Sequence, residues 1–251
     1  MVSRIAVLSD VHGMLPSLDR VLAEPAVQRA DLIVVTGDHT WGPQPTEVLD
    51  RLASLGDGAV LIRGNADREL LQMARGVDVG LADDPVSVWG AAQLGSQHRQ
   101  LLDVMPEHAT IEVDGFGPVF FSHATPRDDE EVVLVDSRLQ RWAEVYRDLP
   151  AEVMTVVCGH THMPFVRLVD RRMVINPGSV GLPYGRAGAH WAVLDGGSIT
   201  LGRTLIDPDE LIRDVTAQSA LPGVEAWLEE AVRQPESDVD VLAAFGLRDG
   251  R

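Results

Sequence analysis

Short apolar runs alternate with amphipathic segments over the first part of the chain. Residues 4–8, 32–36 and 59–62 are mostly apolar and predict strands. Between them, residues 16–23 and 46–55 place apolar side chains at helical spacing, and Pro16 suits the first turn of a helix. This alternation predicts parallel strands joined by right-handed crossovers, with helices packed on the faces of the sheet.

The pattern changes in the middle of the chain. Residues 94–105 predict a further helix, which Pro106 ends, and residues 137–149 predict another. A two-sheet α/β sandwich fits the remaining runs better than a single open sheet, because they are short and closely spaced, as in hairpins. The strands expected from these runs are residues 110–113, 119–121, 153–158, 165–169, 173–175, 190–194 and 199–204.

The last part of the chain returns to a helical pattern. Apolar residues such as Leu211, Val215, Trp227 and Val232 recur at helical spacing, so residues 207–251 are predicted to form a helical C-terminal extension. The sequence contains no internal repeat, low-complexity tract or recognisable linker. We therefore expect one domain over residues 1–251, and a hydrophobic content of 45% is enough for a substantial core.

Charge and composition limit the classes of partner. The chain has 38 acidic and 21 basic residues, a net charge of −17, which disfavours nucleic acid because such proteins need a basic contact face. An anionic substrate is still compatible with this charge where bound divalent cations reverse the local field. The single cysteine, Cys158, excludes an intramolecular disulfide and is expected to fill the core. With neither a leader-like start nor an apolar run of about 20 residues, we expect a cytoplasmic protein without membrane contact.

Five short segments carry potential metal ligands, and each follows a predicted strand. Loops at the carboxyl ends of strands converge on the ligand crevice of α/β sheets. Residues two apart in an extended chain project from one face, so we expect each of the two D-x-H or H-x-H pairs to point in one direction. The carboxylate, imidazole and amide donors suit Mn²⁺, Fe²⁺ or Zn²⁺ better than a thiolate zinc site. The segments are Asp10-Val11-His12, Gly37-Asp38-His39, Gly64-Asn65-Ala66-Asp67, Ser122-His123-Ala124 and Gly159-His160-Thr161-His162.

Taken in order, these segments resemble the signature of the calcineurin-like metallophosphoesterase superfamily: D-x-H, G-D, G-N-H-[DE], H and G-H-x-H. The resemblance runs over residues 10–179, and the turn Asn176-Pro177-Gly178-Ser179 is similar to one in its smaller bacterial and archaeal phosphodiesterases. It implies an α/β/β/α sandwich and two divalent metal ions, with manganese favoured over iron, zinc or nickel. It further implies that a water or hydroxide between the two ions attacks phosphorus.

The resemblance also implies a role for each ligand. One metal ion would be held by Asp10, His12 and His162. The second would be held by Asn65, His123 and His160, and Asp38 would bridge both. Among these residues, Asp38, Asn65 and His123 are expected to take part in catalysis.

One position departs from the family pattern. Ala66 stands where many relatives have a histidine that binds phosphate and protonates the leaving group, although many small bacterial phosphodiesterases of the superfamily also lack it. We expect weak activity on alkyl monoesters and a preference for anhydrides, aryl esters or diesters. His39 is the nearest candidate for the missing acid, and Arg63 and Arg127 are expected to contact phosphate, since guanidinium matches its oxygen pairs. Asp67 is expected to support its loop.

The sequence thus predicts a dinuclear-metal-dependent phosphoesterase that cleaves phosphodiester or phosphoanhydride bonds. A small, nucleotide-like substrate is expected, such as a dinucleoside polyphosphate or a cyclic nucleotide. Trp41, in the loop after Asp38, either packs against the fold or stacks on a base. Two alternatives are a non-catalytic scaffold of the same fold, which would typically have lost several ligands, and a nuclease, which the acidic charge disfavours. The sequence leaves the physiological substrate, the native metal and the oligomeric state open.

Overall fold

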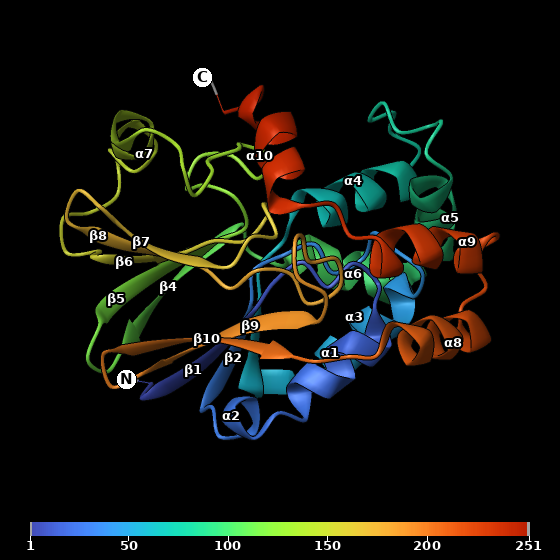
Figure 1. The fold of residues 1–251 in the computed structure, drawn as a ribbon, viewed down its shortest axis with the longest axis horizontal. Helices are drawn as coiled ribbons and strands as arrows, with labels where there is room; N and C mark the ends of the chain where they lie inside the picture. The colour runs from blue at the N-terminus through green and yellow to red at the C-terminus, as the bar shows by residue number, and fades with distance from the viewer. Residues whose placement is uncertain (1, 250–251) are drawn as a thin grey trace.

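The computed structural model describes residues 2–249, and two five-stranded sheets form its centre (Figure 1). The first sheet has the order β10-β9-β1-β2-β3. Its parallel part pairs β1 with β2 and β2 with β3, and β9 adds antiparallel to β1 in the register Ile5↔Leu194. The bounds are β1 (Arg4–Leu8), β2 (Leu32–Val35), β3 (Ala59–Leu61), β9 (Ala189–Asp195) and β10 (Ser198–Thr204).

The second sheet has the order β4-β5-β6-β8-β7. Strands β5, β6 and β8 run parallel, whereas the hairpin partners β4 and β7 lie antiparallel at the two edges. Both sheets are therefore mixed, as expected from a chain that begins with strand–helix–strand units and continues with hairpins. The bounds are β4 (His108–Val113), β5 (Gly117–Ser122), β6 (Thr155–Val157), β7 (Phe165–Val169) and β8 (Arg172–Asn176).

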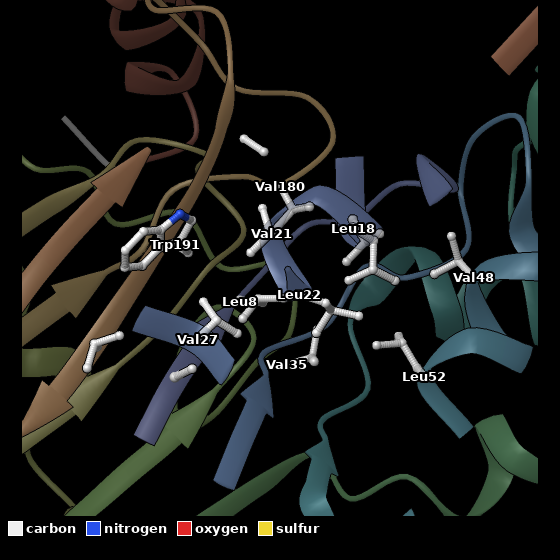
Figure 2. Packing of buried hydrophobic residues seen from close by; sticks show 14 residues of the cluster. Leu8, Leu18, Val21, Leu22, Val27, Val35, Val48, Leu52, Val180 and Trp191 are labelled. Carbon is white, nitrogen blue, oxygen red and sulfur yellow. The ribbon is translucent and has the colours of Figure 1, made fainter. Parts of the chain in front are cut away.

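Buried side chains divide the molecule into four layers. The alternation of β1 places Ile5 and Val7 in a core between the sheets, together with Phe121 of the second sheet. Leu8 faces the other way, into a core beneath α1 and α3 that Figure 2 shows. On the far side of the second sheet, Trp142 of α7 belongs to the cluster that also contains Val156 and Cys158. The predicted α/β/β/α sandwich is confirmed.

Helices cover the outer faces and one end of the sandwich. The sequence analysis predicts α1, α3, α6 and α7 within a few residues of their observed ends, but it misses α2, α4 and α5. Helix α4 begins at Asn65, inside a ligand motif that reads as a loop, and α5 contains Gly90 and an only weakly amphipathic sequence. The bounds are α1 (Leu15–Leu22), α2 (Pro25–Gln28), α3 (Pro45–Ala53), α4 (Asn65–Ala74), α5 (Pro85–Gln93), α6 (Ser96–Val104) and α7 (Leu139–Val145), with a 3-10 turn η1 (Gly56–Gly58).

The C-terminal part is helical over the residues that the structure describes. It comprises α8 (Pro208–Gln218), α9 (Val224–Leu228), a π-helical turn η2 (Glu229–Arg233) and α10 (Asp238–Gly246). Leu211 and Leu228 pack in one cluster with Met14 and Val86, which joins this segment to the loops of the first sheet. None of the helices in residues 2–249 has the length and apolar character that a membrane crossing needs.

Candidate metal centre and pocket

The loops that follow β1, β2, β5 and β6, together with the start of α4, meet between the two sheets. Ligand atoms of Asp10, His12 and His162 lie within 4.8 Å of one another. Those of Asp38, His123 and His160 form a second group within the same limit. The structure thus brings together side chains that are distant in sequence, such as His12 and His162, which are 150 residues apart.

Asp38 belongs to the second group and also approaches His12 of the first group. Its Oδ1 is 3.4 Å from His123 Nε2, and its Oδ2 is 3.7 Å from His12 Nε2. The backbone N–H of Ala66 donates to Oδ1 at 2.9 Å and holds the carboxylate in place. Asn65 completes the second group, with its Oδ1 3.1 Å from His123 Nε2. This is the arrangement a bridging carboxylate requires, and metal coordination by the seven side chains stays a prediction.

Three of the histidines are suited to bind cations because backbone carbonyls accept hydrogen bonds from their Nδ1 atoms. Nδ1 of His12 is 3.1 Å from the carbonyl oxygen of Trp41, and Nδ1 of His162 is 2.7 Å from that of Leu182. Each Nδ1–H therefore donates to a carbonyl, which leaves the Nε2 lone pairs of His12 and His162 facing one another at 3.0 Å. His123 follows the same pattern, with Nδ1 2.7 Å from the carbonyl oxygen of Thr36. Facing lone pairs repel unless a proton or a metal ion lies between them.

The backbone of the ligand loops is left-handed at most ligands. The φ angles are +54° at Asp10, +51° at His12, +53° at Asp38, +65° at His160 and +57° at His162. From the sequence, the paired ligands are expected to project from one face of an extended strand. The backbone at these residues is not extended, so this expectation is wrong. The ligands converge because the chain turns sharply after each strand, a conformation that costs non-glycine residues free energy and is common at functional sites.

Two glycines allow the ligand loops to approach each other closely. A Cβ atom at Gly64 would overlap Oδ1 and the backbone nitrogen of Asp38. At Gly159 it would overlap the side chain of Ser9 and lie 2.7 Å from Asp10 Oδ2. Neither glycine has a positive φ, so here the missing side chain matters rather than backbone freedom.

Electrostatics in the metal-free site follow from burial and close pairing. Burial opposes the charge on Asp38, but His123 and His12 hold the pKa of Asp38 well below its usual range. Burial likewise opposes charge on His123, yet Asp38 and Asp10 raise its pKa to about 10. Burial and the neighbouring His123 lower the pKa of His160 to about 4. The raised pKa of His123 favours a positively charged imidazole beside the Asp38 carboxylate.

Asp67 and the turn after β8 support these loops from behind. Oδ2 of Asp67 accepts hydrogen bonds from His39 Nδ1 at 2.7 Å and from the Gly64 backbone at 3.0 Å. Asn176 donates from Nδ2 to the Gly159 carbonyl at 2.7 Å, and Ser179 donates from Oγ to the Asp10 carbonyl at 2.7 Å. The turn of residues 176–179 is buried beneath both ligand pairs, and it does not line the pocket.

Three predicted catalytic or substrate-binding side chains lie elsewhere. His39 is fully buried, pairs with Asp67 at 2.7 Å and is not among the residues that line the cavity over the ligand groups. Arg63 pairs with Glu107 at 2.9 Å. Arg127 joins Glu131 and Glu144 in a surface cluster. Proximity in sequence to a ligand motif does not predict which arginine reaches the cavity. In this acidic chain, Arg63 and Arg127 form ion pairs with nearby carboxylates instead.

A cavity of about 770 Å³ opens over the ligands. Its floor includes Asp38 and His160, and its walls come from segments distant in sequence. Among the wall residues, only Trp41 follows a ligand motif closely enough to be a candidate from sequence, and no local motif marks the others. In the part of the chain that the structure describes, no arginine lines this cavity, and the sequence contains no lysine. The wall side chains with an aromatic ring or a carboxylate, apart from the proposed ligands, are Trp41, Glu69, Asp84, Tyr184, Trp227, Glu230, Glu236 and Phe245.

Comparison with known proteins agrees with this geometry. The family model of the calcineurin-like phosphoesterase superfamily domain matches residues 4–198. The chain is 28% identical over 199 residues to phosphodiesterase YfcE of Escherichia coli (strain K12), covering 74% of this chain and 84% of that protein. It is 26% identical over 231 residues to a symmetrical bis(5'-nucleosyl)-tetraphosphatase of Klebsiella pneumoniae, covering 75% and 81%. A metallophosphoesterase structure from Sphaerobacter thermophilus superposes with a TM-score of 0.70 at 25% identity, covering 91% of this chain and all of that one.

Proposed function

The chain belongs to the calcineurin-like phosphoesterase superfamily, and we propose from this that it is a metal-dependent hydrolase of small phosphodiesters or phosphoanhydrides. One observation carries the proposal: the ligand atoms of two separate groups converge on either side of Asp38, at the floor of a ligand-sized cavity. The similarity to two relatives, a phosphodiesterase and a dinucleoside tetraphosphatase, supports the same reaction class.

We assign the ligands as the family pattern suggests. One divalent ion would be held by Asp10, His12 and His162. The other would be held by Asn65, His123 and His160, with Asp38 shared. Manganese is favoured by the mixed oxygen and imidazole donors, with iron, zinc or nickel as alternatives. Bound ions of this kind supply Lewis acidity and generate a nucleophile from water at neutral pH.

The protein's own groups orient and limit the reaction. The carbonyl oxygens of Trp41 and Leu182 fix the tautomers of His12 and His162, and that of Thr36 fixes His123, so the donors are preorganised before a substrate arrives. Ala66 lines the cavity without a polar group. A leaving group must therefore depart without help from this position, which favours aryl esters, diesters and anhydrides over alkyl monoesters.

Two other functions fit less well. A non-catalytic scaffold has no need of seven intact ligands, five of which have a strained, left-handed backbone. A nuclease needs a basic, aromatic groove that follows the strand, whereas the described residues that line this cavity include four carboxylates besides Asp38 and no arginine. Both remain measurable outcomes of the test that follows.

The test compares the wild-type protein with Asp38→Asn. We expect about two metal ions per wild-type chain by elemental analysis and Mn²⁺-dependent hydrolysis of bis(4-nitrophenyl) phosphate. Loss of the shared carboxylate should lower kcat/KM by more than the 10- to 100-fold that removal of an outer partner costs. The exposed Asp57→Asn is the matched control and should keep full activity. Wild-type turnover in the Asp38→Asn variant would refute the proposal.

A further inference from the structure

Aromatic rings border the cavity on the side of His12. The Trp41 ring meets the His12 ring edge-on, with centroids 5.6 Å apart and planes at 87°. Trp227 of α9 packs against Trp41 in turn, at 5.9 Å and 69°. Nε1 of Trp41 donates to Asp84 Oδ2 at 2.8 Å, so the indole is held in a fixed orientation.

A second pair of rings borders the side of His162. Tyr184 stacks on the His162 ring, with centroids 5.0 Å apart and planes at 19°. Phe245 of α10 meets Tyr184 edge-on at 6.3 Å and 66°. The two histidine rings are themselves only 4.9 Å apart. The rings form one continuous arc around the first ligand group, in the order Trp227, Trp41, His12, His162, Tyr184 and Phe245.

The four rings of the arc that belong to neither ligand pair are half-buried and line the cavity. Trp41 and Tyr184 lie in loops after β2 and β8, whereas Trp227 and Phe245 come from the C-terminal helices beyond the segment that the family model matches. Half-buried aromatic faces around a cavity are typical of sites that bind planar groups by stacking or edge contacts. The C-terminal extension therefore contributes ring-binding surface directly beside the reacting centre.

The charges of the cavity wall restrict the substrate further. Glu69, Asp84, Glu230 and Glu236 line it, and no arginine does so within residues 2–249. Arg68 lies 3.8 Å from Glu69 and also pairs with Asp129 and Glu130, so three carboxylates share its single charge. Each phosphate charge beyond the one at the metal centre would thus face a wall whose carboxylates outnumber its cations. Extended polyphosphates are disfavoured by this wall.

We propose that the arc recognises a planar aromatic ester group of a monoanionic phosphodiester, and that the acidic wall excludes polyphosphates. The inference rests on the proposed function and narrows it to one substrate class. The rings stack or meet the aromatic group edge-on, while the single phosphate charge lies at the metal centre. Phe245 and Trp227 are then specificity-determining residues rather than catalytic ones.

Binding is the first test, because it does not depend on turnover. Methyl phenylphosphonate and methyl methylphosphonate are monoanions that differ only in a ring, and both resist hydrolysis because of their P–C bond and poor leaving group. Titration calorimetry with the Mn²⁺-loaded protein should give about tenfold tighter binding for the phenyl compound. Phe245→Ala should remove most of that difference. Leu247→Ala, at a side chain 89% exposed just after α10, should leave it unchanged.

Trp227 also packs against the cluster of the C-terminal helices, so Trp227→Ala is measured beside Trp227→Phe. The phenylalanine variant keeps a ring and should retain the phenyl preference when its melting temperature is near wild type. Equal binding of the two phosphonates by the wild-type protein, or an unchanged preference in a folded Phe245→Ala variant, overturns the proposal.

Kinetics separate failure of the inference from failure of the proposed function. Three 4-nitrophenyl phosphodiesters share a leaving group and carry phenyl, methyl or choline as the second ester group. We expect kcat/KM about tenfold higher for the phenyl ester than for the methyl ester, and no comparable hydrolysis of a dinucleoside tetraphosphate. Preference for the choline ester would assign the rings to an ammonium group, and preference for the tetraphosphate would contradict the charge argument; either overturns the inference alone. Absence of Mn²⁺-dependent turnover on all four compounds overturns the proposed function.

Discussion

Five of the seven proposed ligands occupy the left-handed region of the backbone, where a residue with a Cβ atom is disfavoured by about 1–2 kcal/mol. The loops keep this conformation because buried hydrogen bonds over-determine it, as at Ser179 and Asn176 beneath the ligand pairs. The free energy stored there orients the donors without movement when a cation binds. At the scale of single residues, the geometry of the site depends on the left-handed backbone of the ligands and on the buried hydrogen bonds that hold it, as well as on the ligands themselves.

His39 is expected to act on stability rather than on proton transfer. His39→Ala leaves the Asp67 carboxylate buried without its imidazole partner, which should lower the free energy of unfolding by about 3 kcal/mol. Since His39 does not line the cavity, the shape of the pH profile of kcat/KM should not change. Thermal unfolding and a pH–rate series check both points, with the partly exposed His98→Ala as control. Loss of one limb of the pH profile would restore His39 as the acid.

Glu69 gives a pH-dependent effect on the stability of the metal-free protein. Burial and the nearby Glu130 raise the pKa of Glu69 from 4.5 to about 7. The unfolded chain therefore loses this proton above pH 4.5, whereas the folded chain keeps it until about pH 7. The free energy of unfolding falls over that interval and stays lower at higher pH.

Replacing the carboxylate removes this cost. Glu69→Gln should raise the free energy of unfolding by about 2 kcal/mol at pH 8 and change it little at pH 4. Urea unfolding of the metal-free protein at both pH values measures the difference. The exposed Glu112→Gln serves as control. A gain at pH 4 as large as that at pH 8 would show that Glu69 acts through something other than its charge.

At the scale of elements, the ends of strands and the start of one helix define the centre. Asn65 is the first residue of α4, and Gly64 before it touches the loop after β2. The helix thus fixes the amide of Asn65 and the N–H of Ala66 relative to Asp38 in one rigid unit. The close contact of Gly64 with Asp38, in the loop after β2, is therefore needed to place the ligands correctly relative to one another.

Gly64→Ala should disturb the centre without affecting the rest of the fold. An added Cβ overlaps Asp38 Oδ1, so we expect the carboxylate to shift and metal affinity to fall by about 10- to 100-fold. Calorimetric titration with Mn²⁺ measures the affinity. Gly58→Ala meets nothing within 4 Å and is the matched control. Equal affinities in the two variants would mean that the Gly64 contact is unimportant.

The strands and the ligand motifs were within reach of the sequence because both are local. Most strands contain an apolar run, and each ligand motif follows such a run by a few residues. Helix α4 was missed because its first turn is also the Asn65 motif, and α5 was missed because its apolar residues cover most of its surface. Local pattern alone cannot decide such cases.

The pocket wall could not be predicted, because its residues have nothing in common along the sequence. Trp41, Tyr184, Trp227 and Phe245 become neighbours only when the C-terminal helices return to the centre. The position of Arg127 shows the opposite case: its sequence distance to His123 is short, but its side chain pairs with Glu131 and Glu144. Side-chain direction depends on tertiary packing and charge pairing.

At the scale of the whole molecule, a net charge of −17 accompanies a buried centre with two carboxylates and several unprotonated donors. Divalent ions there reduce the repulsion among acidic groups and link distant segments of both sheets. Folding and metal binding should therefore be coupled.

Mn²⁺ at 100 times its dissociation constant should stabilise the folded state by about 2.7 kcal/mol per site. For a chain of this size that corresponds to a rise in melting temperature of roughly 5–10 °C. Differential scanning fluorimetry with Mn²⁺, then with excess EDTA, checks the gain and its reversal. Ca²⁺ at equal concentration controls for screening, since it prefers all-oxygen sites. An equal shift with Ca²⁺ would indicate a general ionic effect instead.

The position of Trp227 and Phe245 outside the segment shared with the family domain has an evolutionary consequence. The first stretch of the gene encodes the proposed metal ligands together with Trp41 and Tyr184, and the second stretch, after the family domain, encodes Trp227 and Phe245. Recombination or extension at the 3' end of the gene can then replace the second stretch while the first stretch, with the proposed metal ligands, stays unchanged. A protein lineage that changes its C-terminal helices in this way can acquire a new substrate preference while it keeps its metal-binding residues.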